Sequence, residues 1–495
     1  MEEEKLSRPE SQKTRVISNF LWRFFERIGA QGVTFIVELV LARILDPAVY
    51  GTLALVTVFT TLMQVFVDSG LGNALIQKKD ADDTDFSSVF YFNIVMCTVL
   101  YGLMFIAAVP ISRFYDKPEL VPVIRVMSLI LVISGVKNVQ QAYVSRHMLF
   151  KKFFFATLAG TVCAAGVGIW MAVRGYGVWA LVAQNLVNMA MDTLVLWITV
   201  KWRPKKTFSW PRLKGLLSYG WKLLASKLLD TLYDELRQLL IGKLYTDADL
   251  AFYNQGKRYP HFAVTNINSS LDSVLFPALS KEQSEPAKVK AITRRAIQVG
   301  TYLLMPVMTG IAVCARPLIS LLVTDKWLPV VPYLRIFCAC YAFYTVNTAN
   351  LNAIKALGRS DLVLKLEFVK KGIGLALLLG TLWISVEALA YSMLLSSVLC
   401  QIINASPNRK LLDYSYKDQV KDMLPQLLLS LFMGACVLAV TLFKLPDPVT
   451  LLIQVPLGVA IYWGGSKLFG IESYGYLLAT AKQLLARFSA RKAEK

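Results

Sequence analysis

Residues 150–206 read FKKFFFATLAGTVCAAGVGIWMAVRGYGVWALVAQNLVNMAMDTLVLWITVKWRPKK. Two apolar runs of about twenty residues are joined by a short turn that carries one basic residue, Arg174. Basic residues flank the pair on both outer sides, at Lys151–Lys152 and at Lys201–Lys206. A helix of about twenty apolar residues crosses a hydrocarbon core roughly 30 Å thick. This stretch therefore predicts a hairpin of two transmembrane helices.

The whole chain has the composition of an integral membrane protein. Of its 495 residues 55% are hydrophobic and only 17% are charged, and the mean hydropathy is +0.50. A soluble protein of this length carries more charge on its surface. The net charge of +20 would suit a nucleic-acid partner. The basic residues lie between apolar runs, however, so membrane topology explains them better and we expect no nucleic acid.

The termini and the cysteines carry less information. The segment 1–18 is polar and mixed in charge, which is unlike a cleavable signal peptide. The seven cysteines all fall in apolar stretches without a CxxC pair. They are typical of buried small hydrophobic residues, so we expect neither disulfides nor a metal site.

The hydrophobic runs predict an all-α fold with about fourteen transmembrane helices. The expected helices are 18–44, 49–77, 86–112, 119–145, 150–173, 177–200, 213–245, 249–279, 290–323, 328–356, 361–383, 385–404, 419–443 and 449–469. The connections between them alternate in charge, with 23 basic residues on one side and 8 on the other. By the positive-inside rule the richer side is cytoplasmic. Both termini, including the basic tail at Arg487, Arg491 and Lys492, are then cytoplasmic.

The chain also repeats itself at an offset of 210 residues. Val121-Pro122-Val123-Ile124-Arg125 matches Val331-Pro332-Tyr333-Leu334-Arg335, and Asp116-Lys117 upstream matches Asp325-Lys326. Six helices separate the copies, which indicates a parallel repeat about an axis normal to the membrane. We therefore expect two six-helix lobes, 1–205 and 206–405, followed by helices 13 and 14 with a basic tail in 406–495. Two lobes around a cleft are typical of an alternating-access transporter.

Polar residues form stripes on the first two helices of each predicted lobe. Each stripe repeats at three or four residues and so occupies one face of its helix. The residues are Arg23, Arg27, Gln31, Thr34 and Glu38 on helix 1; Thr57, Thr61, Gln64 and Asp68 on helix 2; Lys227, Asp230, Asp234 and Arg237 on helix 7; and Asn254, Arg258, His261, Thr265, Asn268 and Asp272 on helix 8. Polar groups are costly inside a membrane, so four equivalent stripes predict a hydrated cavity. Ordinary hydrogen bonds and ion pairs between helices are the alternative for each single residue.

The chemistry of the stripes suggests roles for individual residues. Basic side chains suit an anionic, phosphate-bearing substrate; these are Arg23, Arg27, Lys227, Arg237, Lys257 and Arg258. Groups that bind a proton or cation suit ion coupling; these are Asp68, His261, Glu38 and Asp234. Gln31, Gln64, Asn254, Asn268 and Asp272 complete the polar wall. We expect no cofactor.

Several motifs at the helix ends resemble those of a known family. They are Leu41-Ala42-Arg43-Ile44-Leu45-Asp46-Pro47 with Tyr50-Gly51, Asp68-Ser69-Gly70-Leu71-Gly72-Asn73-Ala74-Leu75-Ile76-Gln77, Phe276-Pro277-Ala278, and Asp325-Lys326-Trp327 before Pro332-Tyr333-Leu334-Arg335. Over about residues 15–420 the sequence resembles the Wzx-type polysaccharide flippases of the MOP exporter superfamily, in particular the colanic acid and teichuronic acid exporter group. The resemblance implies a fourteen-helix, two-lobed protein of the bacterial inner membrane. It also implies ion-coupled movement of undecaprenyl-pyrophosphate-linked sugars to the outer leaflet.

Two other functions are alternatives. A multidrug or cation antiporter of the same superfamily should have an acidic, aromatic cavity, whereas the stripes here are about evenly basic and acidic. A polysaccharide polymerase or ligase would need a large outer loop and a catalytic constellation, and the sequence offers neither. We expect a transporter and not an enzyme, working as a monomer with lipid-linked oligosaccharide, membrane lipids, a coupling H⁺ or Na⁺, and polysaccharide assembly machinery as partners.

Overall fold

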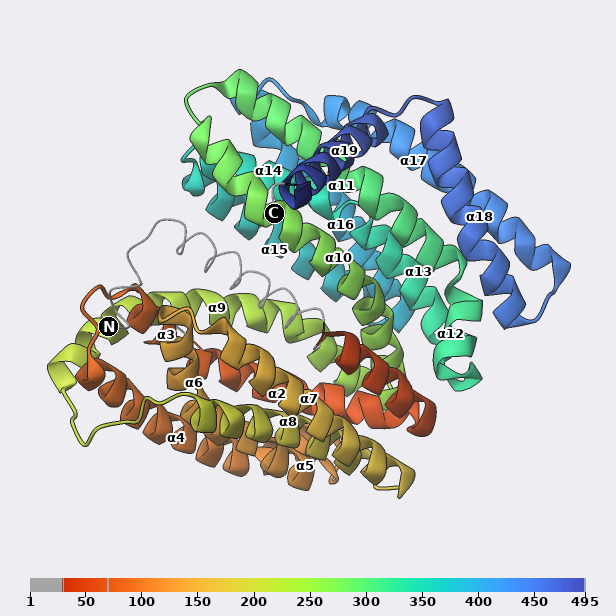
Figure 1. Ribbon diagram of the computed structural model, residues 1–495. Helices are drawn as coiled ribbons and strands as arrows, with labels where there is room; N and C mark the ends of the chain where they lie inside the picture. The colour runs from red at the N-terminus through yellow and green to blue at the C-terminus, as the bar shows by residue number, and fades with distance from the viewer. Residues whose placement is uncertain (1–28, 30, 69–70, 494–495) are drawn as a thin grey trace. The chain divides into compact units, whose positions relative to one another are not determined.

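The computed structural model describes residues 29, 31–68 and 71–493 (Figure 1). The basic residues Arg23 and Arg27, predicted to bind substrate, lie outside the described residues. The described residues form helices joined by short connections, with no β-strand among them. The chain divides into two compact units, of which the first ends at Ala251 and the second begins at Phe252. The all-α prediction is thereby confirmed.

The first unit contains the helix 31–44 and eight labelled helices. They are α2 (Pro47–Asp68), α3 (Leu71–Gln77), α4 (Asp83–Tyr115), α5 (Leu120–Met127), α6 (Leu129–Arg146), α7 (Phe150–Val173), α8 (Val178–Thr199) and α9 (Trp210–Leu244). Helices α7 and α8 form the hairpin expected from residues 150–206 and contact each other closely along their length. Helix α9 contacts α2, α3 and α4.

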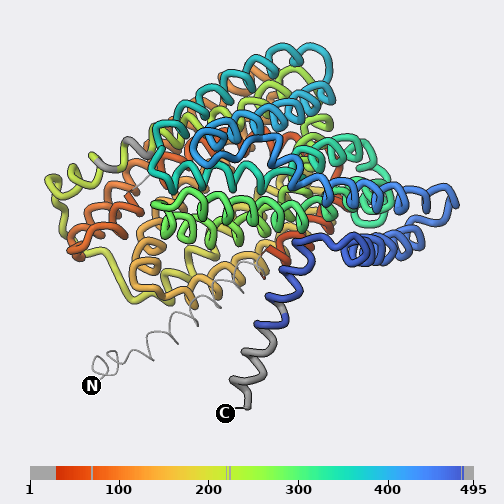
Figure 2. The backbone as a smooth tube through the Cα atoms, turned by 90° about the horizontal axis from the view of Figure 1, so that it is seen from above, coloured from red at the N-terminus to blue at the C-terminus, as the bar shows by residue number. Residues whose placement is uncertain are grey.

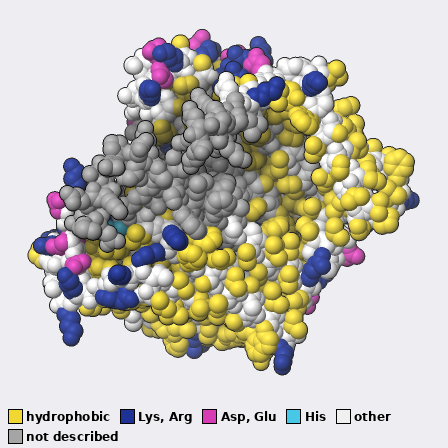
Figure 3. Space-filling model, in the orientation of Figure 1, with side chains coloured by type: hydrophobic (Ala, Val, Ile, Leu, Met, Phe, Trp, Pro, Cys, Tyr) yellow, Lys and Arg dark blue, Asp and Glu magenta, His cyan; other side chains and the backbone are white. Residues whose placement is uncertain are grey.

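The second unit holds the remaining helices, although the first turn of α10 belongs to the first unit. They are α10 (Asp247–Lys281), α11 (Pro286–Val313), α12 (Ala315–Val323), η2 (Asp325–Trp327), α13 (Val330–Tyr341), α14 (Tyr344–Ala356), α15 (Ser360–Thr381), α16 (Val386–Leu411), α17 (Tyr416–Ala439), η3 (Val440–Phe443), α18 (Asp447–Leu468) and α19 (Glu472–Ala493). The hairpin of α17 and α18 lies at the edge of this unit (Figure 2). Hydrophobic side chains cover that hairpin on the face seen in Figure 3.

Each predicted transmembrane segment from 49–77 onward coincides with one helix or with two consecutive helices. Among the described residues, nine helices are long and apolar enough to cross a membrane. Helices α9 and α10 are not among the nine, because the polar stripes lower their mean hydropathy. The count of fourteen spans stays a prediction. Helix α19 was not predicted, since its sequence is too polar to be recognised as a membrane span.

The helix ends have local causes. Helix α4 begins with a capping box, in which the Asp82 carboxylate accepts from the backbone N–H groups of Thr84 at 3.1 Å and Asp85 at 3.0 Å. It ends at Asp116, whose backbone is left-handed with a φ of 57°. The cap places Asp82 beside Arg212 Nη1, at 2.6 Å, and this contact lowers the pKa of the Asp82 carboxyl to about 2.

The internal repeat has a structural counterpart in each unit. The guanidinium Nε of Arg125 donates to the Phe105 carbonyl on α4 at 3.3 Å. Its repeat mate Arg335 donates from the same nitrogen to the Ala312 carbonyl on α11 at 3.2 Å. Each arginine thus ties the short helix after the Asp-Lys motif back to the long helix before it. The same arginine-to-carbonyl hydrogen bond at matched positions supports the repeat. The lobe boundaries at 205 and 405 stay a prediction.

Candidate functional site

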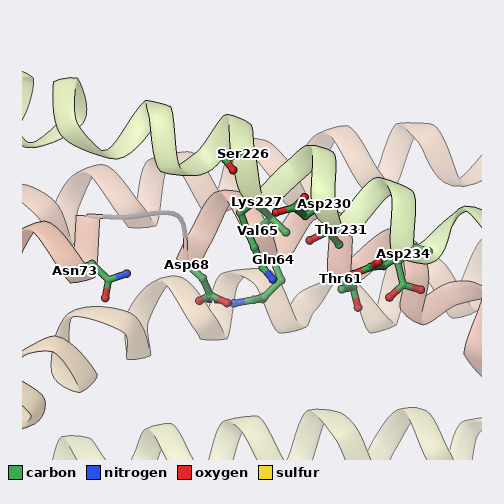
Figure 4. A pocket seen from close by; sticks show the side chains of 11 residues that line it. Thr61, Gln64, Val65, Asp68, Asn73, Ser226, Lys227, Asp230, Thr231 and Asp234 are labelled. Carbon is green, nitrogen blue, oxygen red and sulfur yellow. Dashed lines mark hydrogen bonds between the residues drawn. The ribbon is translucent and has the colours of Figure 1, made fainter. Parts of the chain in front are cut away.

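A polar cavity of about 640 Å³ lies between α2 and α9 in the first unit (Figure 4). Helix α2 and the start of α3 contribute one wall and α9 the other, and side chains of both helices point into the space between them. The lining residues are Thr61, Gln64, Val65, Asp68, Asn73, Ser226, Lys227, Asp230, Thr231, Asp234 and Glu235. Their spacing of three or four residues along each helix is that of one helical face.

This cavity brings together six of the stripe residues named from the sequence: Thr61, Gln64 and Asp68 from helix 2, and Lys227, Asp230 and Asp234 from helix 7. In the predicted division these helices belong to different lobes. Arg237 lies one turn beyond Asp234 on α9, outside the lining. Two stripes that are remote in sequence therefore share one cavity, while the roles assigned to their residues stay predictions.

The cavity lining is more acidic than the stripes predicted, since the stripes hold about as many basic as acidic residues. Four carboxylates, those of Asp68, Asp230, Asp234 and Glu235, face the cavity together with one basic residue, Lys227. The expected balance included basic side chains of helix 1 and helix 8, which are not part of this wall. The described wall is therefore acidic, which suits a cation better than a phosphate.

Asp68 is held at the end of α2 by neighbours on two helices. Gln64 Nε2 donates to Asp68 Oδ1 at 3.2 Å, and Asn138 Nδ2 on α6 lies 3.4 Å from the same oxygen. Asn138 Nδ2 also donates to the Val67 carbonyl at 3.0 Å, which fixes its carboxamide beside α2. A Cβ atom at Gly72 would lie 2.9 Å from Asn138 Oδ1, so a larger residue there would displace the Asn138 carboxamide.

A second, smaller cavity begins on the other side of Asp68. Its volume is about 280 Å³, and α3, α6 and α7 form its walls. The lining residues are Asp68, Gly72, Asn73, Ile76, Asn138, Gln141, Ala142, Ser145, Phe153 and Thr157. Asp68 and Asn73 line both cavities. These two residues therefore stand between the α2–α9 cavity and an oxygen-rich space near the ends of α3 and α6.

A buried ion pair next to this site was not predicted from the sequence. Lys137 Nζ on α6 is paired with Asp192 Oδ2 on α8, and the two side chains are only 12% and 11% exposed. Lys137 directly precedes Asn138, the residue that holds Asp68, in α6. Each residue is a single charge within an apolar helix and belongs to no stripe. Their presence inside two predicted spans was the signal that could have identified them.

A cluster of charged contacts joins the ends of α4 and α9 to the start of α10. Lys117 Nζ lies 2.5 Å from Asp247 Oδ1, and Lys243 Nζ lies 2.8 Å from Asp116 Oδ2. The Thr52 hydroxyl donates to Asp247 Oδ2 at 3.2 Å. We call Thr52, Asp116, Lys117, Lys243 and Asp247 the turn cluster. It holds the α9–α10 connection, which is part of the predicted second lobe, against helices of the predicted first lobe.

The approach of α2 to the turn cluster depends on a glycine. A Cβ atom on Gly51 would lie 1.8 Å from the Asp247 carbonyl oxygen, which no side chain tolerates. The Tyr115 hydroxyl adds a hydrogen bond to the Leu239 carbonyl of α9 at 3.2 Å. The turn cluster therefore holds the end of α4, the end of α9 and the start of α10 in close contact.

The remaining predicted site residues lie elsewhere. On the helix 31–44, Glu38 is buried and Gln31 is half-buried, and neither lines the α2–α9 cavity. On α10, the Asp272 carboxylate accepts from Asn352 Nδ2 of α14 at 2.5 Å. His261 Nδ1 is 3.3 Å from the Thr265 hydroxyl, and its ring lies 5.5 Å from that of Tyr341.

The other α10 residues are not gathered into a described cavity. Asn254 and Asn268 are half-buried, each with one buried amide atom that has no hydrogen-bond partner among the described residues. Lys257 is half-buried and Arg258 is exposed. The convergence of the helix 8 stripe with the others therefore stays a prediction.

Buried amides tie together three helices of the second unit. Asn350 Nδ2 on α14 donates to Gln419 Oε1 on α17 at 2.9 Å, and Gln419 Nε2 returns a bond of 3.0 Å to Asn350 Oδ1. Asn408 Nδ2 on α16 donates to the same Asn350 oxygen at 2.6 Å. All three side chains are fully buried, so this network is structural. The described residues contain no group of His, Cys, Asp and Glu that could hold a metal ion.

The cysteines are less uniformly buried than expected. Cys97, Cys314, Cys338 and Cys340 are buried, but Cys163 is exposed on α7. An exposed position on an apolar spanning helix is compatible with contact to lipid, where a small apolar side chain is not costly.

Comparisons with known proteins agree with this architecture. The family described as "Polysaccharide biosynthesis protein" matches residues 40–332. The succinoglycan biosynthesis transport protein ExoT of Rhizobium meliloti strain 1021 is 23% identical over 344 residues, which cover 70% of each chain. The lipopolysaccharide biosynthesis protein WzxC of Escherichia coli strain K12 is 24% identical over 371 residues, or 73% of this chain and 74% of that protein.

The fold also resembles a solved structure. The lipid II flippase MurJ in an inward closed conformation superposes with a TM-score of 0.75 at 13% sequence identity, covering 92% of this chain and 98% of that one. At this identity the likeness shows the fold alone. Together with the nine described helices that are long and apolar enough to cross a membrane, it agrees with a multi-pass membrane protein. The family match extends over more than half of the sequence and agrees with the resemblance noted in the motifs. This chain belongs to the polysaccharide biosynthesis protein family.

Proposed function

We propose that this protein is a flippase that moves undecaprenyl-pyrophosphate-linked oligosaccharide units across the bacterial inner membrane by alternating access, for surface polysaccharide synthesis. Family membership, the names of ExoT and WzxC, and the fold shared with a lipid II flippase support this function. The observation that carries the proposal is the polar cavity of about 640 Å³ between α2 and α9. Charged groups within membrane helices face the bundle interior or a water-filled cavity and mark substrate or ion pathways.

The size of the cavity limits what it holds. A volume of about 640 Å³ corresponds to the pocket of a small ligand. The cavity is therefore large enough for the first sugars of the headgroup but not for the polyprenyl chain, which remains among apolar helices and lipid. Sugar hydroxyl groups find donors and acceptors in Thr61, Gln64 and Asn73 on one wall and in Ser226 and Thr231 on the other.

The basic and the acidic residues of the site are proposed to bind different parts of the cargo and the coupling cation. Lys227 is the basic residue of the described lining and is the first candidate to meet a phosphate. The other proposed phosphate ligands are Arg23 and Arg27 on helix 1, Arg237 on α9, and Lys257 and Arg258 on α10. Carboxylates repel a pyrophosphate at close range, so we assign the acidic wall to the coupling cation.

Asp68 is the proposed centre of ion coupling. It lines both polar cavities, so a proton or Na⁺ bound there can exchange with either space. Binding would neutralise one of four carboxylates in the wall and change its affinity for a nearby phosphate. Asp234 shares the larger cavity, and Glu38 and His261 are further coupling candidates from the sequence.

The proposed topology gives the turn cluster a role. Both termini are assigned to the cytoplasm, so the α4–α5 and α9–α10 turns lie at the outer surface. Closure of the turn cluster then shuts the outer end of the cavity while lipid-linked sugar enters from the cytoplasmic leaflet. The protein is proposed to work as a monomer and to release its cargo to a polysaccharide polymerase.

One observation favours a second candidate function. Four carboxylates around a cavity are the feature expected of a multidrug or cation antiporter of the MOP superfamily. The family assignment argues against this function, because the match is to polysaccharide biosynthesis proteins.

Co-purification separates the two functions. The protein is extracted in native lipid nanodiscs from its own host, and the bound lipid is identified by mass spectrometry. A polyprenyl pyrophosphate carrying sugars is expected, and its amount should fall severalfold in the Arg27→Ala, Arg258→Ala double variant. Arg174→Ala, which changes an arginine in the α7–α8 turn away from the cavity, is the control. Absence of any polyprenyl-linked sugar, together with proton-driven efflux of organic cations, would establish the antiporter instead.

A further inference from the structure

A second large cavity lies in the second unit, at the end of α17 that is predicted to be cytoplasmic. Its volume is about 670 Å³, and α11, α17 and the turn into α19 form its walls. The lining residues are Arg294, Gln298, Lys421, Asp422, Leu424, Pro425, Gln426, Leu428, Leu429, Phe432, Phe469, Gly470, Ile471 and Glu472. We call it the α17 groove. It is remote in sequence from the α2–α9 cavity, and no step of the proposed function uses it.

The groove has one charged end and one apolar end. Charged groups gather at Arg294, Lys421, Asp422 and Glu472, near the first turns of α17 and α19. Leu424, Leu428 and Phe432 follow Lys421 along α17 at spacings of three or four residues, so they form one stripe. These three apolar side chains are 42%, 57% and 59% exposed. The shape is that of a site for an amphiphile with a charged headgroup.

The length of the stripe indicates what kind of amphiphile fits. From Lys421 to Phe432 the helix rises about 16 Å, at about 1.5 Å per residue. Half of a hydrocarbon core is about 15 Å thick. An acyl chain of one bilayer leaflet therefore matches the stripe, whereas a polyprenyl chain of many isoprene units would extend far beyond it.

The charged end distinguishes between headgroups. The Asp422 carboxylate is already satisfied by Arg294 Nη2 at 2.7 Å, by the Tyr414 hydroxyl at 2.8 Å and by Gln298 Nε2 at 3.3 Å. Glu472 receives one long bond of 3.4 Å, from Gln298 Nε2. Lys421 has no hydrogen bond or ion pair within the part of the chain that the structure describes. The groove thus offers one available cation and one weakly satisfied carboxylate.

We propose that the α17 groove binds a phospholipid with an ethanolamine headgroup from the bilayer leaflet at this end of the protein. The lipid phosphate is held by Lys421, and the primary ammonium donates hydrogen bonds to Glu472. One acyl chain follows Leu424, Leu428 and Phe432. A phosphatidylglycerol headgroup would satisfy Lys421 but would place no cation beside Glu472. A choline headgroup carries the same charges but has no N–H to donate.

Lipid titration of the purified full-length protein tests the site. The protein is delipidated in detergent, and binding of phosphatidylethanolamine, phosphatidylcholine and phosphatidylglycerol with identical acyl chains is measured by native mass spectrometry. We expect phosphatidylethanolamine to bind about tenfold more tightly than the other two, since one charge-assisted hydrogen bond is worth about that factor. Equal affinity for the three headgroups, or a preference for phosphatidylglycerol, would overturn the proposal.

Two variants assign the preference to the named residues. Glu472→Gln should bring phosphatidylethanolamine down to the affinity of phosphatidylcholine, while Lys421→Gln should weaken all three lipids together. Lys417→Gln lies one turn earlier on the same helix, outside the groove lining, and should bind like the unchanged protein. A preference for ethanolamine that survives Glu472→Gln would place the lipid elsewhere. The headgroup comparison uses the unchanged protein, so it stands even if a variant fails to fold, and it is independent of transport.

Discussion

The ion pair between Lys117 and Asp247 should stabilise closure of the end of the α2–α9 cavity that is predicted to face outward. Its Nζ and Oδ1 atoms are 2.5 Å apart, and the two side chains are only 19% and 16% exposed. At an effective dielectric constant of about 20, the attraction is roughly 6–7 kcal/mol. Desolvation of the two ions costs several kcal/mol and removes most of this gain. A net coupling of about 2 kcal/mol remains, which is roughly a thirtyfold change in the ratio of closed to open states.

A double-mutant cycle measures that coupling. Thr61→Cys in a cysteine-free background places a thiol in the cavity wall, and its labelling by an impermeant reagent outside intact cells reports opening. Lys117→Ala and Asp247→Ala should each raise the labelling rate by about thirtyfold, and the double variant should label no faster than either one. Lys444→Ala, in the α17–α18 turn on the same predicted side, should have no effect. Additive effects of the two substitutions, or unchanged labelling in both, would refute the reasoning.

Three further predictions follow from single contacts. Gly51→Ala should abolish export, because its Cβ would lie 1.8 Å from the Asp247 carbonyl oxygen, whereas Gly102→Ala, with no atom within 4 Å, should export normally in the same cell-surface polysaccharide assay. Asp82 should stabilise the protein above about pH 4 and lose this effect as the pH falls, because its pKa in the folded state is lowered to about 2. Thermal unfolding of Asp82→Asn and of the unchanged protein should therefore differ at pH 6 and converge near pH 2, and a constant difference would contradict the assignment. Asn408→Ala should cost about 1–3 kcal/mol of unfolding free energy by breaking the buried amide network, measured by thermal unfolding in detergent; a loss below about 0.5 kcal/mol would show that the network contributes little.

Periodicity explains why part of the site was predictable. Gln64 and Asp68 on α2, and Lys227 and Asp234 on α9, were selected because polar residues at helical spacing share a face. Each stripe had to face something other than lipid, and the two meet across one cavity. Local patterns thus identify which side of a helix is polar, and the high cost of polar groups in lipid implies that such sides face each other.

Contacts between residues remote in sequence were not predictable from such patterns. The Asp116-Lys117 motif was recognised as part of a repeat, but its partners Lys243 and Asp247 lie about 130 residues away. No local sequence pattern predicts a contact between residues so far apart in the sequence. Lys137 and Asp192 were not predicted for a different reason, since each is a lone charge that belongs to no periodic pattern.

The same limits apply to the fold. The long apolar runs predicted the positions of the membrane helices because length and hydropathy are local properties. The break of one predicted helix into α5 and α6 at Ser128 is not marked by a proline or glycine at that residue. Helix α19 has a mean hydropathy too low for a membrane span, and it packs against α11, where the Arg295 guanidinium lies 4.8 Å from the Tyr476 ring.

Reconstituted translocation tests the central claim most directly. The purified protein is placed in liposomes that contain a polyprenyl-pyrophosphate-linked oligosaccharide, and an enzyme or lectin added outside reports the sugar that becomes exposed. We expect translocation that depends on an imposed proton or sodium gradient, falls at least tenfold in Arg258→Ala and Asp68→Asn, and is unchanged in Arg174→Ala. Sugar exposure no faster than in protein-free liposomes, under every ion gradient, would contradict the account.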